Sequence, residues 1–266
     1  MPASSLSQVP HDAARQEPAS VRTRKLRVQA RGQEVLKGID LEAQKGEILS
    51  IIGPAGAGKT TFLRCLNRMI DLDPDLRVSG DVLLDGMSVY DGDVDVAMLR
   101  QQVGMVFSVP IPLPMTISQN LTFGLTLVPG GRSEHADRVE SALRAAFLWE
   151  EVKDRLHEPA RNLSGGQQQR LCLARTLTLE PKVLLLDEPC SGLDPISTGK
   201  IEEALQELKA RLTIVLVTNN VKQASRASDR TAFFLFGEVI EVNSTESLFT
   251  TPRERRTADY ISGRFG

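Results

Sequence analysis

The stretch that decides the fold is a glycine-rich loop, Gly53-Pro54-Ala55-Gly56-Ala57-Gly58-Lys59-Thr60. It follows the apolar run 48–52, which predicts a strand, and the residues after it have the spacing of an amphipathic helix. In this G-x4-G-K-T spacing the glycines let backbone N–H groups surround an anion, the lysine reaches the terminal phosphates, and the threonine hydroxyl binds Mg²⁺. We therefore expect Gly53 to Thr61 to bind the phosphates of a nucleoside triphosphate. An ordinary glycine turn is the alternative.

The composition limits what surrounds this loop. The 266 residues suffice for one large domain or two small ones, and 32 Lys+Arg against 34 Asp+Glu do not indicate nucleic-acid binding. No apolar run reaches the roughly 18 to 20 residues of a membrane-spanning helix. The first residues lack the apolar centre of a secretory signal, so we expect a cytoplasmic protein that reaches a membrane only through a partner. Cys65, Cys172 and Cys190 are scattered and are expected to be reduced thiols.

Patterns along the chain predict an α/β fold. Residues 1–22 lack periodicity and are expected to form a flexible tail. Alternating apolar residues over 26–30 and 35–41, separated by a turn at 31–33, predict antiparallel strands that lead into the 48–52 strand. Further strands are expected at 103–107, 183–188 and 213–217, helices at 133–156 and 198–211, and a closing hairpin over 231–242. Strands that alternate with helices around a phosphate loop predict a mainly parallel sheet.

Two more features are candidates for a functional site. Ser164-Gly165-Gly166-Gln167 has the spacing of a capping box, which leaves free N–H groups at the start of a helix. An ordinary helix cap is the alternative there. The apolar run 183–186 ends in Asp187 and Glu188, which is weakly specific alone. Behind a phosphate loop, however, a second strand that ends in acids supplies the Mg²⁺ carboxylate.

In this order the motifs resemble those of the ATP-binding subunits of ABC transporters, over residues 25–266. The match includes the glycine loop, Leu163–Gln167, the pair Asp187-Glu188 and the run Ser191-Gly192-Leu193-Asp194. More narrowly, separated segments resemble the ATPases of phosphate-specific importers. These segments are Leu66–Met69, Phe107–Met115, Ser164–Arg170, Glu188–Ser191, Leu193–Thr198, Asp229–Phe234 and Asp259–Gly266.

The resemblance implies a phosphate-loop NTPase fold of the ABC type. This is an α/β fold with a mainly parallel core sheet, an N-terminal antiparallel β part and a helical subdomain. The ABC ATP-binding domain would span 23–266, with the helical subdomain at about 88–160. Three prolines in the loop 108–115 exclude a helix there, and in this architecture the loop would touch a membrane permease.

The resemblance also implies a mechanism. Two such subunits, as a homodimer, would sandwich two ATP molecules, with the glycine loop of one facing Ser164–Gln167 of the other. Thr60 and Asp187 would hold Mg²⁺, and Glu188 would polarise the attacking water. Asp194 would lie at the dimer seam.

The implied partners, besides the second ATP-binding subunit, are two integral membrane permease subunits. An extracytoplasmic phosphate-binding protein would act indirectly, and no nucleic acid is involved. The chain would then be a peripheral protein at the cytoplasmic face of the inner membrane.

Three positions depart from the family pattern. Ser108 stands where the family has a glutamine, and Asn219 stands where it has a histidine. Near Arg31 the family has an aromatic ring on adenine, and we expect the Arg31 guanidinium to stack instead. Ser108 is too short to reach Mg²⁺ or water, and Asn219 can donate one hydrogen bond but cannot become a cation. We expect ATP binding to survive and hydrolysis to be slowed, by about 10²-fold or more for each lost contact.

Two hypotheses follow. The first is an ATPase that powers import of inorganic phosphate, and the second is a degenerate subunit that dimerises on ATP with little hydrolysis. The resemblance favours the first, and the second rests on the substitutions at Ser108 and Asn219. Importers of another solute remain alternatives. Soluble ABC ATPases of DNA repair would need a long coiled coil, and those of translation would need two cassettes in one chain.

Overall fold

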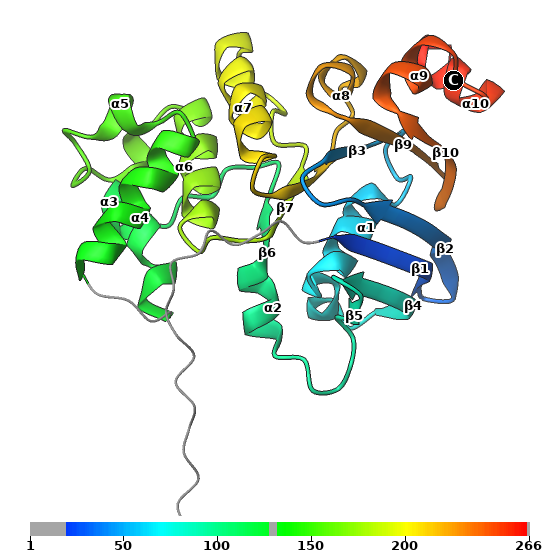
Figure 1. Cartoon of the computed structure of the whole chain (residues 1–266), viewed down its shortest axis with the longest axis horizontal. Helices are drawn as coiled ribbons and strands as arrows, with labels where there is room; N and C mark the ends of the chain where they lie inside the picture. Colours follow the sequence, from blue (N-terminus) through cyan, green and yellow to red (C-terminus); the bar gives the residue numbers. More distant parts are fainter. Residues whose placement is uncertain (1–19, 128–131, 265–266) are drawn as a thin grey trace, which may run out of the picture.

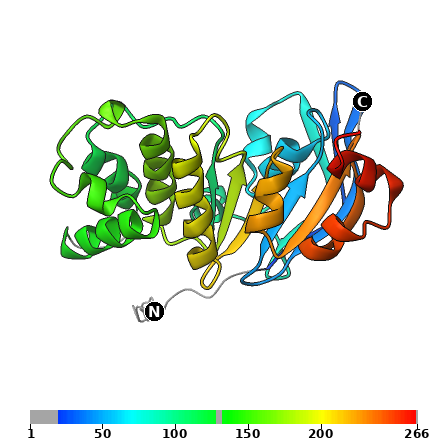
Figure 2. The same cartoon turned by 90° about the horizontal axis from the view of Figure 1, so that it is seen from above.

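The computed structural model describes residues 20–127 and 132–264, and these form two sheets with helices around them (Figures 1 and 2). The first sheet is antiparallel, in the order β2-β1-β4-β5. Its strands are β1 (Val21–Ala30), β2 (Gln33–Ala43), β4 (Leu76–Leu84) and β5 (Met87–Ser88). β1 begins at Val21, one residue before the expected end of the tail at residue 22, and residues 1–19 of that tail lie outside the described residues.

The second sheet is the core of the fold, in the order β10-β9-β3-β8-β7-β6. Its strands are β3 (Ile48–Ile52), β6 (Val103–Val106), β7 (Val183–Asp187), β8 (Thr213–Val217), β9 (Arg230–Leu235) and β10 (Glu238–Ser244). Neighbouring strands from β9 to β6 pair in parallel, and β10 pairs antiparallel with β9 in the predicted hairpin. The expected mainly parallel core sheet with an N-terminal antiparallel part is confirmed.

Alternating side chains of the core strands enter two different hydrophobic clusters. In β7, Leu185 joins the cluster formed with β1, β2 and α1, whereas Leu184 and Leu186 join the cluster on the opposite face. This period of two follows from the pleat of a strand, and both faces are apolar because both are covered. The end of the sheet that carries Asp187 is therefore held between two packed layers.

The helices divide between the two faces and one end of the molecule. They are α1 (Lys59–Leu66), α2 (Val96–Gln102), α3 (Ile117–Thr122), α4 (Arg132–Ala145), α5 (Trp149–Val152), α6 (Gly165–Leu177), α7 (Pro195–Leu208), α8 (Val221–Ala227), α9 (Thr245–Thr250) and α10 (Arg255–Ile261). Helices α3 to α6 pack on one another at one end, and α1 with the antiparallel sheet lies at the other (Figures 1 and 2). The expected helical range of 88–160 thus contains β6, an edge strand of the core, and stops short of α6.

Two predicted helices have different bounds in the structure. The helix expected over 133–156 ends at Ala145, because Phe147 takes a left-handed φ of 52° and closes a Schellman motif. In this motif the Leu148 N–H donates to the Leu143 carbonyl at 2.9 Å. The helix expected from residue 198 begins at Pro195, because the preceding Asp194 is its N-cap.

The described part of the chain contains no helix that is long and apolar enough to cross a bilayer. The three cysteines are free thiols, as expected, and Cys65 and Cys172 are buried.

Gly104 allows the helical end to pack closely on the core. A Cβ at this position of β6 would lie 2.4 Å from the Thr176 Cγ2 of α6. Thr176 cannot move away freely, because its hydroxyl donates to the Cys172 carbonyl at 3.1 Å. We expect Gly104→Ala to lower the free energy of unfolding by about 1 to 3 kcal/mol, measured by urea denaturation.

The matched variant removes the obstructing methyl group. Thr176→Ser keeps the hydroxyl, so the double variant Gly104→Ala/Thr176→Ser should recover most of the loss, with Thr176→Ser alone as the reference. A double variant as unstable as Gly104→Ala would contradict this account of the packing.

Candidate functional site

The glycine loop joins β3 to α1 at the C-terminal end of the core sheet, where open parallel sheets bind ligands. Two of its glycines are required by close contacts. A Cβ at Gly53 would lie 2.2 Å from the Phe234 carbonyl oxygen, and one at Gly58 would lie 2.7 Å from Leu36 Cδ2. Gly58 is also the N-cap of α1, with a left-handed φ of 96°. The loop can therefore curl back with Ala55, Gly56 and Thr60 exposed, and Thr61 follows in the first turn of α1.

Lys59 is a buried cation inside the loop, with only 6% of its surface exposed. Its Nζ donates to the carbonyl oxygens of Gly53 at 2.7 Å and Pro54 at 2.9 Å. Burial lowers the pKa of Lys59, whereas the carboxylates of Glu188 and Asp187 raise it. The ammonium group is thus placed next to two acids at the mouth of the loop.

Thr60 and Asp187 meet across the sheet. The Thr60 hydroxyl donates to Asp187 Oδ1 at 3.0 Å, as expected of residues at the ends of β3 and β7. Burial raises the pKa of Asp187, while the Thr60 hydrogen bond and the Lys59 charge lower it. An exposed hydroxyl beside a carboxylate is the oxygen donor set that suits Mg²⁺ with a nucleotide. In the described residues no group of three His, Cys, Asp or Glu could hold a metal by itself.

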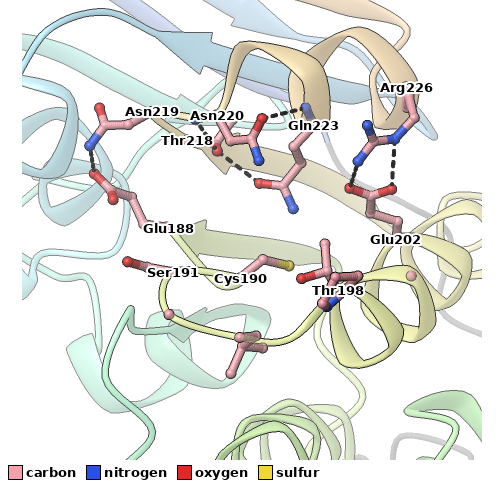
Figure 3. Close-up of a pocket in the computed structure, with 14 residues that line it drawn as sticks. Glu188, Cys190, Ser191, Thr198, Glu202, Thr218, Asn219, Asn220, Gln223 and Arg226 are labelled. Atoms are coloured by element: carbon pink, nitrogen blue, oxygen red, sulfur yellow. Dashed lines mark hydrogen bonds and ion pairs between the residues drawn. The ribbon is translucent and has the colours of Figure 1, made fainter.

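Glu188 and Asn219 point toward each other at the edge of a cavity (Figure 3). Glu188 leaves β7 with a left-handed φ of 49°, and its N–H donates to the Val217 carbonyl at 2.8 Å. Its carboxylate accepts a hydrogen bond from Asn219 Nδ2. The cavity, of about 580 Å³, lies between the ends of β7 and β8 and the starts of α7 and α8. Cys190 lines it, and burial raises the pKa of this thiol to about 11, which makes it a poor nucleophile.

Ser164 and Gln167 form the predicted capping box at the start of α6. The Gln167 N–H donates to Ser164 Oγ at 3.3 Å, and the Ser164 N–H donates to Gln167 Oε1 at 3.0 Å. Gly165 is exposed, whereas a Cβ at Gly166 would lie 2.1 Å from Ser197 Oγ of α7. The glycine therefore lets the capped helix start pack closely on α7.

Asp194 lies beside this helix start. Its carboxylate accepts from the N–H groups of Ile196 at 3.0 Å and Ser197 at 2.9 Å, and from the Ser197 hydroxyl at 2.6 Å. The structure thus brings the Ser164–Gln167 segment and Asp194 together. Both views show α6 away from the α1 end of the same chain, so the chain carries two separate groups of predicted site residues (Figures 1 and 2).

Glu151 connects these elements and was not singled out from the sequence. It lies in α5 and accepts hydrogen bonds from Gln167 Nε2 at 2.8 Å, Arg170 Nη1 at 2.8 Å and Lys200 Nζ at 2.6 Å. The Arg170 hydrogen bonds, with those of Lys200 and Gln167, lower the pKa of Glu151 to about 2. A single acid in an amphipathic stretch carries no local signal of such contacts, because its partners come from α6 and α7.

The two remaining predicted site residues, Ser108 and Arg31, lie in different parts of the fold. Ser108 follows β6, and the end of β6 is held beside β7 because Gln169 Nε2 donates to the carbonyls of Phe107 at 2.8 Å and Pro189 at 3.0 Å. Arg31 lies in the turn between β1 and β2, where its guanidinium pairs with Asp75 at 2.7 Å. Stacking of Arg31 on a base would require this exposed pair to open.

A phosphate loop at the end of a parallel sheet, with a threonine hydroxyl bound to the acid of a second strand, defines a nucleotide-binding protein. Residues 36–191 match the sequence model of the ABC transporter family. Over 231 residues the chain is 56% identical to the phosphate import ATP-binding protein PstB 2 of Shouchella clausii, covering 87% of this chain and 86% of that protein. Over 235 residues it is 52% identical to PstB 1 of Enterococcus faecalis, covering 88% and 93%. The chain belongs to the ABC transporter family, in the group of phosphate import ATP-binding proteins.

Two solved structures share the fold. A bacterial Atm1-family ABC exporter with ATP bound is 26% identical with a TM-score of 0.78, over 98% of this chain and 45% of the exporter chain. The cbiO1 protein of Clostridium perfringens, part of the ABC transporter complex cbiONQ, is 28% identical with a TM-score of 0.77, over 92% and 96%. This chain is accordingly an ATP-binding component of an ABC transporter.

Glu151 should contribute measurably to stability. Glu151→Gln leaves Arg170, whose side chain is 3% exposed, without its carboxylate, so we expect a loss of about 1 to 3 kcal/mol in the free energy of unfolding. Glu150→Gln is the matched control, because the Glu150 carboxylate is exposed and pairs with Lys153 at the surface. It should change stability by less than about 0.5 kcal/mol. Equal effects of the two variants would contradict the assigned role.

The same contacts predict a pH dependence. Because folding lowers the pKa of Glu151 from 4.5 to about 2, its contribution is fully present above pH 4.5 and is lost as the pH falls toward 2. The difference in unfolding free energy between the natural chain and Glu151→Gln should therefore shrink over this range, measured by urea denaturation at each pH. A difference that stays constant would show that the charge of Glu151 is not responsible.

Proposed function

We propose that this chain is the ATP-binding and hydrolysing subunit that powers import of inorganic phosphate through a membrane ABC permease. Phosphate is supported by identity above 50% to two phosphate import ATP-binding proteins over most of the chain. Hydrolysis is supported by the Thr60–Asp187 hydrogen bond, which sets a Mg²⁺ ligand pair directly beside Glu188.

We call Gly53–Thr61, Asp187, Glu188 and Asn219 the loop half of the site, and each of these residues has a distinct proposed task. The N–H groups of Gly53 to Thr61 surround the phosphates, and Lys59 supplies positive charge to the terminal phosphate. Thr60 and Asp187 hold Mg²⁺, which would offset charge on the phosphate oxygens. Glu188 orients and polarises the attacking water, and Asn219 orients Glu188 and donates to the γ-phosphate. Ser108 and Arg31 occupy peripheral places, near the water and near the base.

We call Ser164–Gln167 and Asp194 the clamp half of the site, and it acts on the ATP that a second copy of the chain binds. The N–H groups of Gly165 and Gly166 lie between the two capping-box residues at the start of α6, where the helix dipole favours an anion. Within one chain this helix start and the phosphate loop lie in different parts of the molecule (Figure 1). In a homodimer each loop half would meet the clamp half of the partner, with the exposed Asp194 at the seam.

The permease partners would bind the loop after β6. Its exposed apolar side chains favour an apolar contact, with exposed fractions of 65% for Val109 and 64% for Ile111. Two integral membrane permease subunits would dock there and place the chain at the cytoplasmic face of the inner membrane. An extracytoplasmic phosphate-binding protein would deliver the ion to these permeases.

Steady-state hydrolysis of Mg²⁺-ATP tests the catalytic proposal. Glu188→Gln removes the carboxylate that polarises the water, so turnover should fall at least about 10²-fold while ATP binding persists. If Glu188→Gln turned over ATP at the natural rate, the role of Glu188 would be wrong.

The double variant Ser108→Gln/Asn219→His tests the two departures from the family pattern. It restores a longer amide and a titratable ring, so we expect faster turnover, by up to about 10²-fold for each contact. A natural chain as inactive as Glu188→Gln, with activity gained only in the double variant, would favour the nucleotide-gated subunit instead. Phosphate uptake by the assembled transporter, present in the natural chain and absent in Glu188→Gln, tests the substrate.

A further inference from the structure

Glu188 leaves β7 in a backbone conformation that is uncommon for a residue other than glycine, with a φ of 49°. Such a conformation persists only where the surrounding contacts hold it. On one side the Glu188 N–H donates to the Val217 carbonyl at 2.8 Å, and the Ser191 N–H donates to the Glu188 carbonyl at 3.1 Å. Pro189 has no N–H, so the residue directly after Glu188 cannot donate to a neighbour. Its carbonyl can still accept a hydrogen bond from another part of the fold.

Gln169, in the second turn of α6, supplies this hydrogen bond and is only 1% exposed. Its Nε2 donates to the Pro189 carbonyl at 3.0 Å and to the Phe107 carbonyl at 2.8 Å. The pairing of β6 with β7 ends one residue earlier, at Val106 and Leu186. The Gln169 amide therefore joins the two chain segments just beyond the last pair of the ladder, next to Glu188.

The other half of the Gln169 amide indicates that this residue is not there for stability alone. Its Oε1 is buried and has no hydrogen-bond partner among the residues that the structure describes. A buried acceptor without a partner is unfavourable, and an apolar side chain would avoid it. The amide cannot turn over to relieve this, because both of its neighbours are carbonyls and need the nitrogen as donor. The two N–H bonds of Gln169 thus have a cost, which points to a role for them.

The helix that carries Gln169 is firmly anchored. The next residue, Arg170, has a side chain that is 3% exposed, and its Nη1 pairs with Glu151 of α5 at 2.8 Å. Arg170 Nη1 also donates to the Phe147 carbonyl. Because α6 is fixed in this way, Gln169 holds the turn after Glu188 against a rigid support. The same helix begins with Ser164–Gln167 of the clamp half.

We propose that Gln169 is a positioning residue for Glu188, which it holds in the orientation that polarises the attacking water. It does so through the Pro189 carbonyl, without touching ATP or water itself. Because α6 begins with the clamp half, this amide also connects the clamp half to the catalytic carboxylate of the same chain. The inference rests on the catalytic role proposed above for Glu188.

Gln169→Met tests this, because it keeps the length of the side chain and removes both donors. In the purified full-length chain we expect kcat for Mg²⁺-ATP to fall about tenfold or more, since a small displacement of a catalytic group is costly. The KM and the dissociation constant of a non-hydrolysable ATP analogue should stay within about twofold, because the phosphate loop is untouched. Gln169→Asn keeps the amide but is one methylene shorter and cannot reach both carbonyls, so it should show the same split. Urea denaturation checks that each variant is folded under the assay conditions.

A double variant separates positioning from a general structural effect. If Gln169 acts through the Glu188 carboxylate, adding Gln169→Met to Glu188→Gln should lower the residual single-turnover rate by less than about twofold. A merely structural role would lower that rate by the same factor as in the natural chain.

Gln206 provides the control. Its Nε2 also donates to the backbone carbonyl of another helix, at Ala227 and 2.8 Å, but away from Glu188. Gln206→Met should leave kcat unchanged. An unchanged kcat in both folded Gln169 variants, an equal loss in Gln206→Met, or a full loss that persists beside Glu188→Gln would overturn the inference.

Glu188→Gln alone distinguishes failure of this inference from failure of the proposed function. If Glu188→Gln turns over ATP at the natural rate, the proposed role of Glu188 is wrong and the role of Gln169 falls with it. If Glu188→Gln loses turnover while Gln169→Met does not, the catalytic proposal stands and only the role of Gln169 is rejected.

Discussion

The buried ammonium group of Lys59 needs hydrogen-bond acceptors and negative charges around it, and the surrounding structure supplies both. A cation is stable away from water only where acceptors and opposite charges surround it. The Gly53 and Pro54 carbonyls accept its hydrogen bonds, and the carboxylates of Asp187 and Glu188 raise its pKa against the effect of burial. Those acids are available because β3, β8 and β7 run parallel and end at the same edge. The glycines allow the loop to bend tightly, so that the Lys59 side chain can reach the carbonyls at the start of the same loop.

The same geometry underlies the proposal that one chain holds two halves of a site. The end of the core sheet supplies the phosphate loop and the acids, whereas the start of α6 lies among the helices at the other end. Glu151 fixes the orientation of this second half, because it joins α5 to Gln167 of α6 and to Lys200 of α7. Asp194 caps α7 next to it. The separation of this helix start from the phosphate loop of the same chain supports the proposed pairing with a second copy.

Local patterns predicted the fold well, and they singled out the loop and the acids that the structure places at one end of the core sheet. The apolar run before Gly53, the acids after 183–186 and the capping box at Ser164 each lie within a few residues, where spacing alone specifies the structure. The sequence did not show the end of α4, because a left-handed Phe147 lacks the usual glycine signal. Contacts between distant segments were also hidden from local patterns. These contacts are Glu151 with α6 and α7, and Asn219 with Glu188.

Complementation between two inactive variants tests the central claim, that each site is built from two chains. Lys59→Ala disables the loop half, and Gly165→Asp places a negative charge at the clamp, where a Cβ meets no atom within 4 Å. Each variant alone should be inactive in ATP hydrolysis. An equal mixture should regain activity, up to about a quarter of the natural rate, since half of the random pairs hold one complete site. A mixture without activity, or a fully active Gly165→Asp chain, would contradict the claim.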